Sequence, residues 1–158
     1  MFQKAKPYVL SILLALGVGG LSALLTAQNQ DLYSEIVTPP LAPPGWLFPV
    51  VWTVLYILMG ISAAMIYTDN SNSSETRCEA LFPYSVSLLV NFFWSILFFN
   101  MRVFLFSFIW LLLLLFLIVL TIIRYYKIRP LAAYLQIPYA VWVTFAGYLN
   151  LAIWILNK

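Results

Sequence analysis

Residues 103–123 read VFLFSFIWLLLLLFLIVLTII and contain no charged side chain. A helix of about 20 such residues is long enough to cross the roughly 30 Å hydrocarbon core of a bilayer. The rest of the chain has a similar composition, with 64% hydrophobic and only 8% charged residues. Soluble domains carry about 25% charged residues. The composition therefore excludes an ordinary soluble globule and indicates a polytopic membrane protein.

Hydropathy predicts five membrane spans in a single domain that covers residues 1–158. Each span should be an α-helix, because a segment in lipid must satisfy its own backbone hydrogen bonds. The predicted fold is therefore an all-α bundle of five transmembrane helices. The spans are expected at about 8–27, 45–67, 80–99, 103–123 and 130–156, with a long outer loop at 28–43.

Two absences restrict the chemistry of the chain. It has no histidine and a single cysteine, Cys78. Histidine acid–base catalysis, a histidine-ligated haem, zinc sites built on histidine or paired cysteine, and internal disulfides are all excluded. We expect no metal site and no required cofactor. No ionisable residue lies deep in a predicted span, which disfavours a proton- or sodium-coupled transporter.

The basic residues predict the orientation of the bundle. One side of the membrane would carry six of them and the other side only two, and the positive-inside rule places the richer side in the cytoplasm. The N-terminus is then cytoplasmic and the C-terminus outside, in what we expect to be a bacterial cell membrane. Cleavage of the first span as a signal peptide is disfavoured, because Leu25 occupies a position that needs a small residue. The six residues are Lys4, Lys6, Arg77, Arg124, Lys127 and Arg129, and the two are Arg102 and Lys158.

Two features each allow two interpretations. Ala15, Gly19 and Ala23 form a ridge of small residues that permits close helix approach, either within the bundle or in a homodimer. Residues 39–44 contain four prolines, which make the end of the outer loop stiff and extended. That loop is either a lid over the bundle or a connector that starts the second helix.

Three predicted helices present aromatic faces with few polar atoms. Such faces fit a flat apolar ligand, although aromatic residues are also common in membrane bundles for packing alone. An amide near mid-membrane is costly unless bonded, so Asn91 and Asn150 should face the bundle interior. The faces consist of Trp52, Tyr56 and Gly60; of Asn91, Trp94, Ser95 and Phe98; and of Pro138, Trp142, Ala146 and Leu149.

Three motifs together resemble the TspO/MBR family, whose members are also called translocator proteins, tryptophan-rich sensory proteins or peripheral-type benzodiazepine receptors. Residues 43–56 read PPGWLFPVVWTVLY, residues 89–94 read LVNFFW and residues 138–142 read PYAVW. The resemblance implies a five-helix bundle, commonly a homodimer, with a pocket under the first loop. It implies binding of protoporphyrin IX and of isoquinoline-carboxamide-type ligands. The implied ligand-binding residues are Tyr33, Trp46, Trp52, Asn91, Trp94, Phe98, Trp142, Ala146 and Leu149.

Some bacterial members of the family are reported to degrade protoporphyrin IX in light. The resemblance implies that Trp52 and Trp142 would carry that photochemistry. An excited porphyrin is a strong oxidant, and a stacked indole can supply an electron without a metal. The sequence leaves three functions open: a protein that senses or photodegrades the porphyrin, a transporter of a lipophilic molecule, and a stress-signalling scaffold that reports ligand occupancy.

Overall fold

The computed structural model describes the backbone of residues 2–29 and 31–158, and the side chains from residue 5 onward within those ranges. Every regular element in the described residues is helical, which confirms the predicted fold class. In chain order the helices are α1 (Phe2–Thr26), the 3₁₀ turn η1 (Ala27–Asn29), α2 (Leu32–Glu35), α3 (Leu47–Tyr67), α4 (Ser74–Ser95), the π-helical turn η2 (Ile96–Asn100), α5 (Phe104–Ile128), α6 (Pro130–Tyr134) and α7 (Ile137–Leu156).

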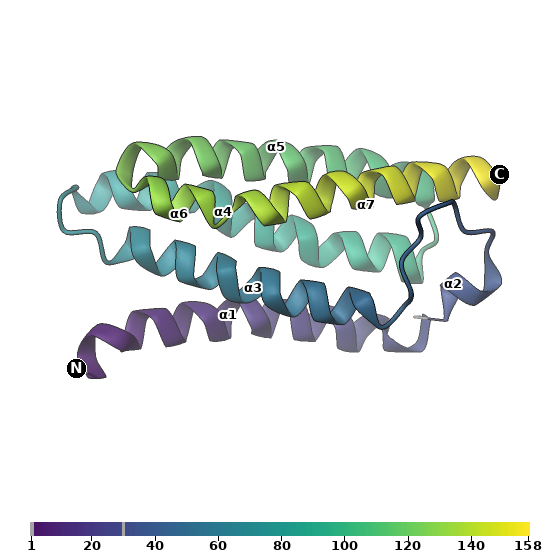
Figure 1. Ribbon diagram of the computed structural model, residues 1–158, viewed down its shortest axis with the longest axis horizontal. Coiled ribbons are helices and arrows are strands. Elements are labelled where there is room, and N and C mark those ends of the chain that lie inside the picture. The colour runs from purple at the N-terminus through teal and green to yellow at the C-terminus, as the bar shows by residue number, and fades with distance from the viewer. Residues whose placement is uncertain (1, 30) are drawn as a thin grey trace.

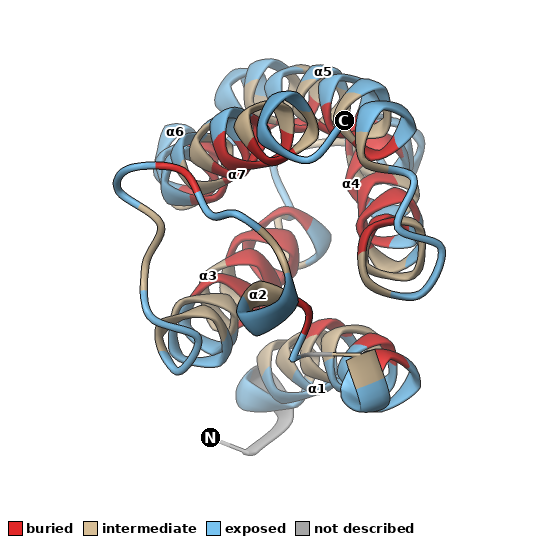
Figure 2. Ribbon diagram, turned by 90° about the vertical axis from the view of Figure 1, so that its right-hand side faces the viewer, coloured by how far each residue is buried: buried red, intermediate tan, exposed pale blue. Residues whose placement is uncertain are grey.

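Five helical segments of the described residues are long and apolar enough to cross a membrane. They lie side by side, and the two termini lie at opposite ends of the bundle (Figure 1). Viewed along the helices, α1, α3, α7, α5 and α4 follow one another around the bundle (Figure 2). The second helix in this order, α3, also contacts α4 across the interior.

The helix ends differ from the hydropathy estimate at four places. The first helix begins at Phe2 and not near residue 8. The fourth span does not stop at residue 123, because α5 continues to Ile128. The third begins at Ser74, where the Ser73 side chain accepts a hydrogen bond from the backbone N–H of Thr76 and caps the helix. The fifth is interrupted between α6 and α7, just before Pro138, where a kink is expected because proline cannot donate to the carbonyl of Tyr134. Hydropathy marks where the hydrocarbon ends, whereas capping and proline decide where a helix ends.

The small residues of α1 and α3 bring these two helices into close contact. A Cβ atom on Gly60 would lie 2.6 Å from the Cα atom of Ile12, and one on Gly19 would lie 2.1 Å from the Tyr56 ring. Ala15 is fully buried, whereas Ala23 is exposed. The ridge predicted on α1 therefore serves packing within the bundle over Ala15 and Gly19.

Polar contacts within the short connection between α3 and α4 stabilise its conformation. The Asp69 carboxylate accepts hydrogen bonds from the Asn72 side chain and from the backbone N–H of Ser71, both at 3.0 Å. These bonds lower the pKa of the Asp69 carboxyl, and the bond from the Asn72 side chain contributes most. The connection lies outside the membrane-spanning segments, at the end of the bundle where α1 begins (Figure 1).

Candidate functional site

A segment of about 20 residues between α1 and α3 passes over one end of the bundle (Figures 1 and 2). We call residues 27–46 the lid, and this end of the bundle the lid end. The lid includes η1 and α2, and its other described residues are irregular. Leu41 lies in the left-handed backbone region at φ 70°, an unusual conformation for a residue with a side chain. The proline-rich part of the loop is thus a turn with a fixed shape.

Neutral hydrogen bonds fasten the lid to the last helix. The Asn157 amide makes two bonds of 2.9 Å with Val37, one from the backbone N–H to Oδ1 and one from Nδ2 to the carbonyl. The hydroxyl of Tyr148 donates to the carbonyl of Pro40 at 3.0 Å. The turn between η2 and α5 provides another attachment, because Arg102 forms an ion pair with Glu35 at 2.8 Å.

A cavity of about 460 Å³ lies beneath the lid. We call it the lid cavity. It lies among α1, α3 and α4, with the lid above, and Asp31 is the one charged residue in its described lining. Its volume is within the range of about 300–1,000 Å³ that is typical of small-molecule sites. It is lined by Gly19, Ser22, Ala23, Thr26, Asp31, Tyr33, Gly45, Trp46, Phe48, Pro49, Trp52, Tyr56, Asn91, Trp94, Ser95 and Phe99.

Trp52 occupies the centre of the aromatic wall. Its ring stacks on Tyr56 at a centroid distance of 5.6 Å and meets Tyr139 edge-on at 6.1 Å. The second indole of the wall, Trp94, lies 6.5 Å from it. These contacts from three helices restrict the Trp52 indole, while one side of it borders the cavity.

Asn91 supplies the amide of the wall. It is buried, as predicted, and its Nδ2 donates to the hydroxyl of Tyr56 at 2.7 Å. Its Oδ1 and the indole N–H of Trp94 have no hydrogen-bond partner among the described residues. Buried polar atoms without partners are costly, so this wall contains one unsatisfied acceptor and one unsatisfied donor. Asn150, on α7, is also buried as predicted, but it lies outside the cavity lining.

The structure brings five of the nine predicted ligand-binding residues together in the lid cavity: Tyr33, Trp46, Trp52, Asn91 and Trp94. Phe98 lies behind the wall, stacked on Trp94 at 5.5 Å. The three predicted residues of α7 are not in the lining. Trp142 is separated from the cavity by Phe48, whose ring centroid lies 5.9 Å from that of Trp142. Ala146 and Leu149 are buried elsewhere along α7.

The wall contributed by α1 has no counterpart in the sequence-based set. Ser22 and Thr26 lie one helical turn apart and both face the interior. The Ser22 hydroxyl donates to the carbonyl of Phe92, and that of Thr26 donates back to the carbonyl of Ser22. The small-residue ridge was the available signal, because Gly19 and Ala23 lie on this same face and line the cavity.

The fold and the cavity define a class: an all-helical integral membrane protein with an aromatic, ligand-sized cavity under a lid. Comparison with known proteins then gives the family. The model of the TspO/MBR family matches residues 11–155, and the chain belongs to this family. It is 38% identical to the tryptophan-rich protein TspO of Archaeoglobus fulgidus over 150 residues, which are 94% of this chain and 95% of the relative.

Two further relatives extend the comparison. The tryptophan-rich protein TspO of Chlorobaculum tepidum is 36% identical over 149 residues, covering 94% of both chains. The translocator protein of Bos taurus is 33% identical over 126 residues, covering 80% of this chain and 75% of the relative.

Proposed function

We propose that the lid cavity binds a tetrapyrrole, with protoporphyrin IX as the representative ligand, for sensing or for light-dependent degradation. The observation that carries the proposal is the wall formed by Trp52, Trp94 and Asn91. Two indoles 6.5 Å apart offer apolar ring surface, and beside them are an acceptor and a donor without partners. A flat apolar ring system with carbonyl or propionate groups at its edge matches this combination. Isoquinoline-carboxamide-type ligands, also flat and amide-bearing, fit the same wall.

Trp52 is the residue that we assign to photochemistry. A bound porphyrin would supply light absorption and a strongly oxidising excited state. Trp52 borders the cavity and is held by Tyr56 and Tyr139, so its indole is placed to give up an electron at contact distance. Trp142, the other residue of the predicted pair, would act from behind Phe48. We therefore expect Trp52 to contribute more than Trp142.

The test is a titration of the purified, detergent-solubilised chain with protoporphyrin IX, in the dark and then under light. Tryptophan quenching reports binding, and porphyrin absorbance reports consumption. We expect saturable quenching, and bleaching faster than with heat-denatured protein. Absence of saturable quenching would refute the tetrapyrrole site, whereas binding without bleaching would refute degradation and leave sensing.

Three tryptophan variants separate the roles of the indoles. Trp52→Phe and Trp142→Phe each remove one candidate donor, and Trp154→Phe is the matched control because Trp154 lies outside the cavity lining, near Lys158. We expect Trp52→Phe to bind the porphyrin and bleach it more slowly, Trp142→Phe to show a smaller loss, and the control to match the parent. Equal bleaching rates in all four proteins would refute the assignment to Trp52.

Transport is the second function that the sequence left open, and the name of the Bos taurus relative, translocator protein, supports it. Porphyrin flux into liposomes that contain the protein, compared with empty liposomes, distinguishes it from sensing and degradation. A scaffold would instead change its dimerisation or partner binding with ligand and consume none. The homodimer implied by the family is part of this proposal, and its mass in detergent with and without porphyrin tests it.

We also propose that the end opposite the lid faces the cytoplasm. Lys6, Arg77, Arg124, Lys127 and Arg129 lie at that end, while Arg102 and Lys158 lie at the lid end. Cys78, the sole cysteine of the sequence, is exposed and lies at the basic end. A membrane-impermeant maleimide should therefore label it in lysed cells and leave it unlabelled in intact ones. Labelling in intact cells would reverse the orientation.

A further inference from the structure

A second cavity lies at the opposite end of the bundle from the lid. It has a volume of about 710 Å³ and lies between the beginning of α1, the end of α3 and the beginning of α4. It shares no lining residue with the lid cavity. We call it the basic cavity, after Arg77, the one charged residue in its described lining. It is lined by Pro7, Tyr8, Tyr67, Thr68, Asn70, Ser74, Arg77, Cys78 and Leu81.

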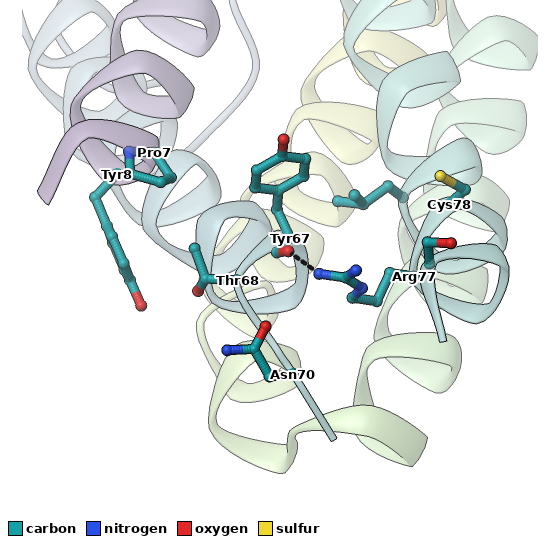
Figure 3. Close-up of a pocket in the computed structure, with 9 residues that line it drawn as sticks. Pro7, Tyr8, Tyr67, Thr68, Asn70, Arg77 and Cys78 are labelled. Atoms are coloured by element: carbon teal, nitrogen blue, oxygen red, sulfur yellow. Dashed lines mark hydrogen bonds between the residues drawn. The ribbon is translucent and has the colours of Figure 1, made fainter. Parts of the chain in front are cut away.

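Arg77 is held in place but is not neutralised. It reaches from α4 to the end of α3, where its Nη1 donates to the backbone carbonyl of Tyr67 at 2.6 Å (Figure 3). Its Nε is buried and has no hydrogen-bond partner among the described residues. No carboxylate of the described residues lies within 4 Å of its guanidinium, and the ion pair that the described residues do form, between Arg102 and Glu35, lies at the lid end. An arginine keeps its charge, so this half-buried cation requires an anion or water.

The walls around Arg77 are those of a site at the membrane edge. Pro7 and Tyr8 lie across the cavity from Arg77 (Figure 3). Leu81, four residues after Arg77 on α4, adds an apolar side chain to the lining. Tyrosine is enriched where the hydrocarbon meets the headgroups, and Tyr8 and Tyr67 both line this cavity. The cavity therefore combines a cation near the end of the membrane-spanning helices with apolar side chains beside it.

We infer that the basic cavity binds the headgroup phosphate of an anionic phospholipid, with Arg77 as its principal donor. Arginine presents several N–H groups in a fixed plane, which suits phosphate oxygens. Other basic residues at the same end, Lys127 and Arg129, add to the attraction for anionic lipid. A free phosphate would leave most of the cavity and its apolar wall unfilled, whereas a glycerophospholipid fills both. The inference is independent of the proposed tetrapyrrole site.

The test compares two arginines that are matched in contact and charge. Arg124 also donates to a backbone carbonyl, that of Glu79, at 2.6 Å, but it does not line the cavity. The parent, Arg77→Gln and Arg124→Gln are purified as full chains in detergent and titrated with phosphatidylglycerol, phosphatidylcholine or inorganic phosphate. Binding is followed by the shift in thermal unfolding temperature and by lipid adducts in native mass spectrometry.

We expect phosphatidylglycerol to bind the parent and Arg124→Gln alike and Arg77→Gln about tenfold more weakly, the size of one charge-assisted hydrogen bond. Equal binding by all three proteins would overturn the inference, and so would equal binding of phosphatidylcholine. Displacement of the lipid by inorganic phosphate at similar concentration would assign the site to free phosphate instead. Should Arg77→Gln fail to fold, Leu81→Trp keeps the charge and fills the cavity, and it should weaken lipid binding in the same way.

Discussion

The two ends of the bundle contain cavities of opposite character. At the lid end, α1, α3 and α4 enclose an aromatic space of about 460 Å³ that is closed by a tied loop. At the other end the same three helices surround about 710 Å³ with one unneutralised arginine and a short polar connection. Three helices thus build two different sites, because each helix lines the two cavities with different side chains.

The largest expected effect comes from the close contact between α1 and α3, two helices that line both cavities. Gly60→Ala would place a Cβ atom 2.6 Å from the Cα of Ile12, and neither backbone can yield cheaply. We expect a destabilisation of about 1–3 kcal/mol, with weaker ligand binding at both cavities, because α1 lines both. Thermal unfolding in detergent measures it. The control Gly20→Ala meets nothing within 4 Å and should not lower the unfolding temperature, and equal values for both variants would contradict the prediction.

A change confined to the lid end should separate the two cavities. Asn91→Leu removes the unpaired acceptor and the donor to Tyr56, and we expect tetrapyrrole binding to weaken by about 1–3 kcal/mol. Fluorescence titration measures the loss, and phosphatidylglycerol binding should be unchanged. The matched control is Asn150→Leu, which removes a buried amide whose atoms have no partner and which lies outside the lining. Loss of binding in both variants would show that any buried amide has this effect.

The smallest expected effect concerns the attachment of the lid. Asn157→Ala removes two hydrogen bonds to Val37, both exposed, which together are worth about 1 kcal/mol. We expect tetrapyrrole dissociation to become about fivefold faster, with little change in the unfolding temperature. Stopped-flow competition measures the dissociation rate. Lys158→Ala, next to it, is the control and should match the parent, and an unchanged rate in Asn157→Ala would mean that the lid does not limit release.

The sequence predicted the number and type of the helices because the conditions for a transmembrane helix are met or missed within each segment alone. A segment in lipid must be about 20 residues long, apolar and helical, and 103–123 meets that condition on its own. It did not predict that α5 runs on to Ile128. Arg124 remains helical while its side chain reaches the carbonyl of Glu79 on α4, a contact that depends on the neighbouring helix.

The cavity was predictable on the helices whose faces carry large aromatic side chains. Trp52 and Asn91 lie on stripes visible in the sequence, and both line the lid cavity. The pairing of helix faces is decided only in the packed bundle. Nothing in the sequence therefore indicated that Trp142 lies behind Phe48. On α1 the sequence indicated a ridge for close helix approach, within the bundle or in a homodimer, but it did not indicate that Gly19 both admits the Tyr56 ring and borders the cavity.

The attachment of the lid to Asn157 has a practical consequence for anyone who purifies this protein. An affinity tag fused after Lys158 would begin close to the Asn157 amide that holds Val37, and we expect it to disturb the loop above the lid cavity. A tag on the N-terminus instead lies a few residues from Pro7 and Tyr8, at the opposite cavity. Each tag position therefore perturbs a different cavity. A preparation tagged at one end serves as the reference for ligand binding at the cavity of the other end.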